Sequence, residues 1–105
     1  LKLTEEEMSP KRKGDFAEYY AVTWLWDQGF EVFKNAGCTG SVDMIAWDKT
    51  TGETILIDVK TVHISKTGGR NTIKNLRTEE QQKQNVRLLQ FWPDTRKLNF
   101  TEHTT

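Results

Sequence analysis

The sequence SVDMIAWDKTTGETILIDVKTV, residues 41–62, contains two strand-like runs on either side of a short turn. Residues 41–48 and 53–62 are rich in β-branched and other apolar residues, and the four residues between them end in Gly52. This pattern predicts a β-hairpin with a four-residue loop. In such a hairpin Asp48 pairs with Glu53, so the numbers of paired residues sum to 101.

This register predicts that two acidic residues face each other. Asp43 lies opposite Asp58, and side chains directly opposite on paired strands have Cβ atoms about 4.5–5.5 Å apart. Two carboxylates at this separation repel each other, whereas one divalent cation can bind both. Lys60 follows two residues later on the same face, within reach of a phosphate or a water molecule at that ion. The hairpin therefore predicts a Mg²⁺ site that suits hydrolysis of a phosphodiester bond.

An amphipathic helix is predicted before the hairpin. Ser9 and Pro10 are typical of a helix start, and Gly29 is typical of a helix end. An apolar stripe at helical spacing lies between them: Ala17, Tyr20, Ala21, Trp24 and Leu25. Glu18 borders this stripe, so it can point towards the sheet as a third carboxylate.

The remaining pattern predicts the order of the other elements. We expect a strand over residues 30–34, a loop over 35–40, a long polar loop over 63–77, a short helix capped by Thr78 and continuing to about Gln84, and strands over 86–92 and 97–101. Helix, three strands, helix and one or two strands indicate a mixed α/β (α+β) fold with a central mixed sheet flanked by helices. We expect one domain over residues 1–105, with 1–8 as a flexible tail.

Composition restricts the class of protein. No apolar run approaches the roughly 18 residues of a membrane span. Cys38 is the only cysteine, which excludes an internal disulfide framework and favours a reducing, cytoplasmic setting. The 15 basic and 15 acidic residues give a net charge of zero, but residues 59–78 hold five basic residues and no acidic one. Local basic patches can attract DNA even when the total charge cancels.

Three segments resemble the PD-(D/E)XK nuclease superfamily, in particular archaeal Holliday-junction resolvases and phage endonucleases. The first contains Glu18 in the predicted helix. The second is Gly40-Ser41-Val42-Asp43, and the third is Asp58-Val59-Lys60. Val42 stands where the motif has proline, and Asp58 stands where many members have glutamate. The resemblance covers residues 14 to about 91.

The resemblance implies a restriction-endonuclease-like core and assigns roles to the matching residues. Asp43, Asp58 and Glu18 would bind Mg²⁺ or Mn²⁺ together with the Val59 carbonyl, and Lys60 would be the catalytic lysine. A helix glutamine would join them, with Gln81 as the first choice and Gln82 as the alternative. The protein would then be a DNA endonuclease, either structure-specific or of the restriction or phage type, in the cytoplasm of a bacterial, archaeal or phage-infected cell.

Partners are predicted on the same basis. We expect a homodimer, which would supply two active sites for two DNA strands, and duplex or branched DNA as substrate. The basic residues predicted to contact DNA are Lys11, Arg12, Lys13, Lys66, Arg70, Lys74 and Arg77. The alternative is a non-catalytic or partner-dependent DNA-binding module on a nuclease scaffold.

Several other residues favour structural roles over functional ones. His63 follows the second hairpin strand and is expected to be structural, although a histidine there could transfer protons. Cys38 is expected to fill a small apolar space. The four tryptophans are expected in the core or in a dimer interface: Trp24, Trp26, Trp47 and Trp92.

Overall fold

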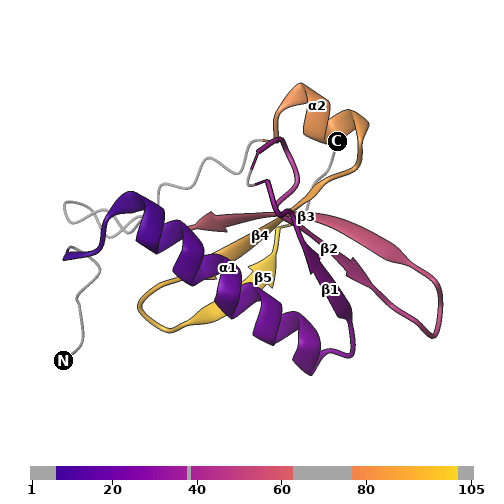
Figure 1. Ribbon diagram of the computed structural model, residues 1–105, viewed down its shortest axis with the longest axis horizontal. Helices are drawn as coiled ribbons and strands as arrows, with labels where there is room; N and C mark the ends of the chain where they lie inside the picture. The colour runs from indigo at the N-terminus through magenta and orange to yellow at the C-terminus, as the bar shows by residue number, and fades with distance from the viewer. Residues whose placement is uncertain (1–6, 38, 63–76, 102–105) are drawn as a thin grey trace.

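A computed structural model describes residues 7–37, 39–62 and 77–101. In this part of the chain one long helix and one short helix flank a five-stranded sheet (Figure 1). The elements are α1 (Pro10–Asp27), β1 (Glu31–Lys34), β2 (Met44–Trp47), β3 (Thr54–Thr61), α2 (Glu79–Lys83), β4 (Arg87–Trp92) and β5 (Lys97–Phe100). The strands follow one another across the sheet in sequence order, and only β3 and β4 are parallel.

Helix α1 begins and ends where the sequence predicts. The Ser9 side chain accepts a hydrogen bond of 3.2 Å from the Arg12 backbone N–H, and Pro10 occupies the first turn. Gly29 follows the helix with a φ of 91°, a left-handed conformation that a side chain would disfavour. The chain therefore leaves the helix sharply and enters β1.

The core lies between α1 and one face of the sheet, as Figure 1 shows. Alternate residues of the strands point to this face, and α1 contributes most of its predicted apolar stripe. Tyr20 is the exception, because it is 37% exposed and lies outside the buried cluster. The buried cluster consists of Ala21, Val22, Leu25, Met44, Ala46, Ile57 and Leu89. Asp58 and Lys60 are separated from Ile57 by odd steps along β3, so their side chains point to the opposite face.

The predicted hairpin register is confirmed. Met44 pairs with Ile57 and Trp47 with Thr54, so paired numbers sum to 101. The turn is closed by a 2.8 Å hydrogen bond from the Asp48 N–H to the Glu53 carbonyl. Gly52 has a φ of 78° in this turn, which favours glycine.

The first hairpin strand is shorter than predicted. It begins at Met44 rather than at residue 41, because side chains bind the backbone carbonyls that a longer strand would use. The Val42 carbonyl accepts from the Asn35 side chain at 3.0 Å, and the Ser41 carbonyl accepts from the Gln81 side chain at 3.0 Å. Residues 39–43 therefore form a shaped loop that leads into β2.

The connection from β3 to β4 contains α2 and is a crossover, as a parallel pair requires. Its residues 63–76, which include most of the predicted polar loop, lie outside the described residues. The short helix is capped by Thr78 as predicted, and both predicted strands after it are present. No helix within the described ranges is long and apolar enough to cross a membrane.

Candidate active site

Asp43 and Asp58 are brought together where β2 begins, but not by simple pairing in the ladder. The Asp43 N–H donates to the Ile57 carbonyl at 2.8 Å, so the register shifts by one residue, as at a β-bulge. The Asp43 carboxyl then accepts a 2.7 Å hydrogen bond from the Val59 N–H. If β2 were longer, a backbone carbonyl of β2 would accept this hydrogen bond. The Asp43 carboxyl accepts it instead. Asp43 and Asp58 are therefore not the directly opposed pair of the ladder that the sequence predicted. Instead, the Asp43 carboxyl hydrogen-bonds to the Val59 N–H and to the Asp58 side chain.

The electrostatics of this pair are strained. The pKa of the Asp43 carboxyl rises from 3.8 to about 7, first because the group is buried and then because it hydrogen-bonds to Asp58. The negative charges of Asp58 and Glu18 raise this pKa further, while the Val59 N–H opposes the shift. Burial and the neighbouring acids therefore favour the protonated form of Asp43.

The Val59 carbonyl is directed towards the β2 side of β3, where Asp43 contacts this strand. Backbone groups of alternate residues in β3 face β2, as the bond from Asp43 to the Ile57 carbonyl shows. Val59 lies two residues later, so its N–H and carbonyl face this side too, beyond the first residue of β2. The two carboxyl groups and this carbonyl form a set of hard oxygen ligands, which suits Mg²⁺ or Mn²⁺.

Lys60 lies beside Asp58 on the face of β3 that points away from α1. Its Nζ is 3.3 Å from Asp58 Oδ2. The Asp58 side chain is 10% exposed and that of Lys60 is 53% exposed, so the ammonium group extends from the buried acid towards solvent. A phosphate that approached the acidic pair would meet this positive charge.

Gln81 lies on α2, which Figure 1 shows close to the loop before β2, and its side chain contacts the site. Its Nε2 donates to Asp58 Oδ2 at 2.9 Å and to the Ser41 carbonyl at 3.0 Å. Its Oε1 accepts from the Thr78 N–H at 3.0 Å, within a capping box. The side chain is 5% exposed, and these three bonds fix which end of the amide faces Asp58. Gln81, not Gln82, is therefore the helix glutamine at the site.

Replacing Gln81 by leucine is expected to lower the free energy of unfolding by about 2–3 kcal/mol, because buried polar groups lose their partners. The matched control is Gln82→Leu. Gln82 is exposed and donates from its side chain to the Arg77 carbonyl, so its replacement should cost less than about 0.5 kcal/mol. Urea denaturation of both variants measures the difference. Equal losses would show that α2 does not fasten the site through Gln81.

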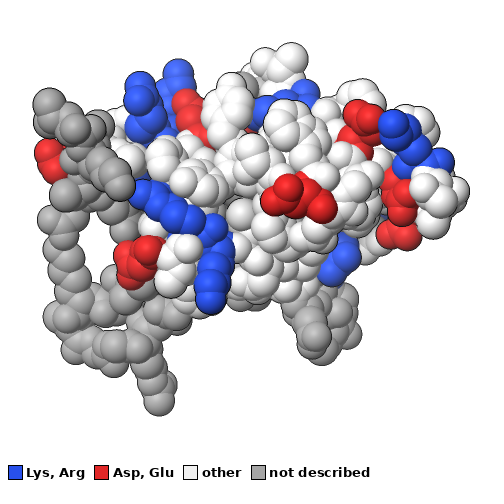
Figure 2. Space-filling view, turned by 90° about the horizontal axis from the view of Figure 1, so that it is seen from below, with Lys and Arg blue, Asp and Glu red and all other residues white. Residues whose placement is uncertain are grey.

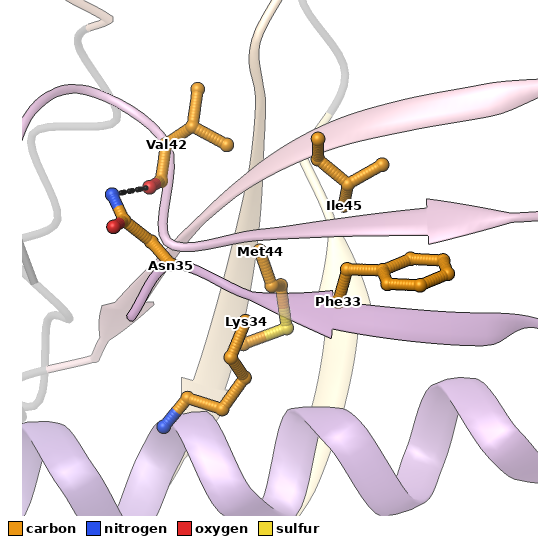
Figure 3. A pocket seen from close by; sticks show the side chains of 6 residues that line it. All are labelled: Phe33, Lys34, Asn35, Val42, Met44 and Ile45. Carbon is orange, nitrogen blue, oxygen red and sulfur yellow. Dashed lines mark hydrogen bonds between the residues drawn. The ribbon is translucent and has the colours of Figure 1, made fainter. Parts of the chain in front are cut away.

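Asn35 shapes the loop that carries Asp43. Its side chain donates to the Thr39 carbonyl at 2.6 Å and to the Val42 carbonyl at 3.0 Å, and accepts from the Gly37 N–H. Figure 3 shows the bond to Val42 beside a hollow of about 240 Å³. Sequence reasoning missed Asn35, although an asparagine two residues before a glycine is typical of such turns.

The negative charge of Glu18 contributes to the raised pKa of Asp43. It also forms an ion pair with Lys34, whose Nζ is 3.6 Å from Glu18 Oε1. Within the described ranges, no three His, Cys, Asp or Glu side chains converge closely enough to form a metal cluster by themselves. The structure therefore does not bring Glu18 into one cluster with Asp43 and Asp58, and Lys34 is a neighbour that the sequence did not indicate.

The predicted DNA contacts fall into three groups. Lys11 and Arg12 are exposed in the first turn of α1, and Lys13 is half-buried. Arg77 donates from Nη1 to the Val86 carbonyl at 3.3 Å, so it supports the start of β4. The other three predicted contacts lie outside the described residues: Lys66, Arg70 and Lys74. His63 and Cys38 also lie outside them.

The tryptophans divide between the core and the surface. Trp24 packs against the core and contacts Phe100 edge-on, with ring centroids 5.7 Å apart. Trp47 is half-buried, and Trp92 donates from Nε1 to the Asn99 side chain at 2.6 Å. Trp26 is 58% exposed and is not a core residue.

Comparison with known proteins finds a similar solved structure but no match in sequence. No protein-family profile matches the chain, and no curated protein matches it in sequence. Among solved structures, the chain is similar to the bacterial homing endonuclease I-Ssp6803I, with a TM-score of 0.75 and 20% sequence identity over 90% of this chain and 69% of that chain. The predicted mixed α/β fold with a central mixed sheet is confirmed, and it is a fold that a DNA-cutting enzyme uses.

Proposed function

We propose that this protein is a metal-dependent nuclease that hydrolyses phosphodiester bonds of DNA. The observation that carries the proposal is the convergence of Asp43, Asp58 and Lys60. Stability alone does not favour two carboxyl groups in contact at a partly buried position. An acidic pair beside a lysine suits a divalent cation and the phosphate that it would bind.

Mg²⁺ fits the residues present. Asp43, Asp58 and the Val59 carbonyl would hold it, because Mg²⁺ prefers one or two carboxylates and keeps several water molecules. When bound, the ion supplies Lewis-acid activation of the phosphate and of a water molecule. Asp43, whose pKa is raised to about 7 by burial and by its acidic neighbours, would be relieved of its charge conflict by such a cation.

The surrounding residues would then act on the phosphate or on the acids. Lys60 would stabilise negative charge that develops on the phosphate, since its ammonium group reaches solvent beside Asp58. Gln81 would be a positioning residue, because it fixes the Asp58 carboxylate and the loop at Ser41. Glu18 would add negative charge to the ion's surroundings.

DNA is the nucleic acid that the similarity favours, because the homing endonuclease with this fold acts on it. The net charge of zero gives no general attraction. Figure 2 shows positive and negative side chains interspersed on one face of the molecule. Attraction would come from local groups such as Lys11, Arg12 and Lys13 at the start of α1. Cations at a helix N-terminus oppose the helix dipole, so helix stability does not explain them.

We also propose that two copies pair, since a dimer would supply two active sites for the two strands of a duplex. The proposal also includes a reducing cytoplasmic setting, which is expected because Cys38 is the only cysteine in the sequence. The competing function is a DNA-binding module that does not cut.

The test is cleavage of plasmid, single-stranded and branched DNA by the full chain with Mg²⁺ or Mn²⁺. We expect nicked or linear products with either ion and none with EDTA. The Lys60→Met variant should still bind DNA but should not cut it. Lys97 is an exposed lysine on β5, so the Lys97→Met variant should both bind and cut DNA. DNA binding without any metal-dependent product would support the non-cutting module instead.

A further inference from the structure

The outer side of α1 carries a hollow of about 430 Å³. Its lining residues follow the i, i+3, i+4, i+7, i+8 spacing of one helix face: Arg12, Asp15, Phe16, Tyr19 and Tyr20. This face is turned away from the buried residues Ala17, Ala21 and Leu25. The hollow has the size of sites that bind small organic groups.

Two aromatic residues of the hollow, Phe16 and Tyr20, pack against other side chains. The Tyr20 ring packs on Phe91 at 5.2 Å and on Phe16 at 5.0 Å between centroids, and Phe91 is buried. The Arg96 guanidinium lies 4.5 Å from the Phe16 ring and 5.6 Å from the Tyr20 ring. Because these contacts hold the Phe16 and Tyr20 rings before any ligand binds, these two rings would lose little conformational entropy on stacking.

Tyr19 connects the hollow to the ion pair between Lys34 and Glu18. Its side chain is 63% exposed, so core packing does not explain it. Lys34 lies 4.2 Å over its ring and 3.6 Å from Glu18. Figure 3 shows the Lys34 side chain extending towards α1. The charge of Glu18 contributes to the raised pKa of Asp43. The hollow therefore adjoins the ion pair between Lys34 and Glu18.

We propose that this hollow binds an unpaired nucleotide of the DNA substrate. The inference rests on the proposed nuclease function and adds the class of DNA that is recognised. The base would stack on Tyr19 and Tyr20, since aromatic side chains bind any base through its flat face. Arg12 would contact a flanking phosphate. The Asp15 carboxylate, which would repel a phosphate, can accept a hydrogen bond from an amino group on the edge of the base.

The chemistry selects unpaired DNA over intact duplex. Within a duplex, both faces of a base are covered by its neighbours, so only an unstacked nucleotide can reach the tyrosine rings. A second copy of the chain could also cover exposed aromatic side chains. Three cations lie beside these rings, Arg12, Lys34 and Arg96, against the two acids Asp15 and Glu18, and this excess favours a ligand that carries negative charge together with a flat ring.

The test measures binding by the full chain in EDTA, where no metal-dependent cutting occurs. The probes are a single strand, a duplex, and a duplex with an unpaired 2-aminopurine. We expect the two DNAs with unpaired bases to bind more tightly than the duplex, and the 2-aminopurine fluorescence to be quenched. Tyr19→Ala should weaken binding to both by about tenfold and remove the quenching, while Tyr19→Phe keeps the ring and should retain both.

Trp26→Ala is the matched control, because Trp26 is similarly exposed and lies two turns further along the same helix. Equal effects of Tyr19→Ala and Trp26→Ala, or no preference for unpaired DNA, would overturn the subsite. A smaller sedimentation coefficient for Tyr19→Ala with unchanged DNA binding would assign the face to a second copy and also overturn it. Cleavage by the wild-type protein is scored separately. Tyr19-dependent binding without cleavage rejects the nuclease and keeps the subsite.

Discussion

Replacing Asp58 by asparagine is expected to lower metal-dependent DNA cleavage by about 1,000-fold. The variant loses one of two carboxylates that would hold the cation. A bound metal supplies several kcal/mol of transition-state stabilisation, and 1.36 kcal/mol corresponds to about tenfold in rate. The measurement is the rate of plasmid nicking under saturating Mg²⁺.

The fold of this variant should be preserved, so the loss can be assigned to chemistry. The asparagine oxygen can still accept the hydrogen bond that Gln81 Nε2 donates to Asp58. Asp94→Asn is the control, because Asp94 is an exposed acid in the turn between β4 and β5. An Asp58→Asn protein that folds normally and cuts at more than a tenth of the wild-type rate would remove Asp58 from the mechanism.

Replacing Asp43 by asparagine is expected to abolish cleavage but to stabilise the metal-free protein at pH 8. The folded-state pKa of Asp43 is raised from 3.8 to about 7 by burial, by Asp58 and by Glu18. Above pH 7 the wild-type protein must hold this unfavourable charge. An asparagine can accept from the Val59 N–H and donate to the Asp58 carboxyl without adding charge.

The direction of the pH dependence follows from this raised pKa. Between about pH 4 and pH 7 the folded protein keeps a proton that the unfolded chain releases, so wild-type stability falls as pH rises through this window. Since one pKa unit corresponds to about 1.4 kcal/mol and solvent screens part of it, we expect Asp43→Asn to be more stable by about 2 kcal/mol at pH 8. The advantage should be small near pH 4, where the wild-type carboxyl is protonated in the folded state and partly protonated in the unfolded state.

Thermal unfolding in EDTA at pH 4 and pH 8 measures this effect, with a Tm about 5–10 °C higher for the variant at pH 8. Adding Mg²⁺ at pH 8 provides the complementary test. It should raise the Tm of the wild-type protein and leave Asp43→Asn nearly unchanged, because ligand binding stabilises only a protein that binds. A variant that is no more stable than wild type in EDTA at pH 8 would contradict the charge conflict at this site.

Local patterns in the sequence predicted most of the elements and the central feature of the site. The turn before Glu53 allows few registers, so one short loop placed Asp43 near Asp58 and Lys60 beside them. The ends of α1 were equally readable, because Ser9 and Gly29 satisfy local backbone requirements. Each of these inferences depends on residues within one or two turns of a helix or on the two strands of one hairpin.

The sequence by itself determined the order of elements, the hairpin register and the residues of the acidic pair. Tertiary structure alone decided between Gln81 and Gln82, placed Lys34 against Glu18 and Asn35 against Val42, and shifted the register at Asp43. Gln81 and Gln82 both satisfy the pattern of a short helix, and adjacent helix residues point about 100° apart. Which of them faces Asp58 depends on how α2 packs on the sheet, because contacts between segments distant in the chain are set by packing rather than by local preference.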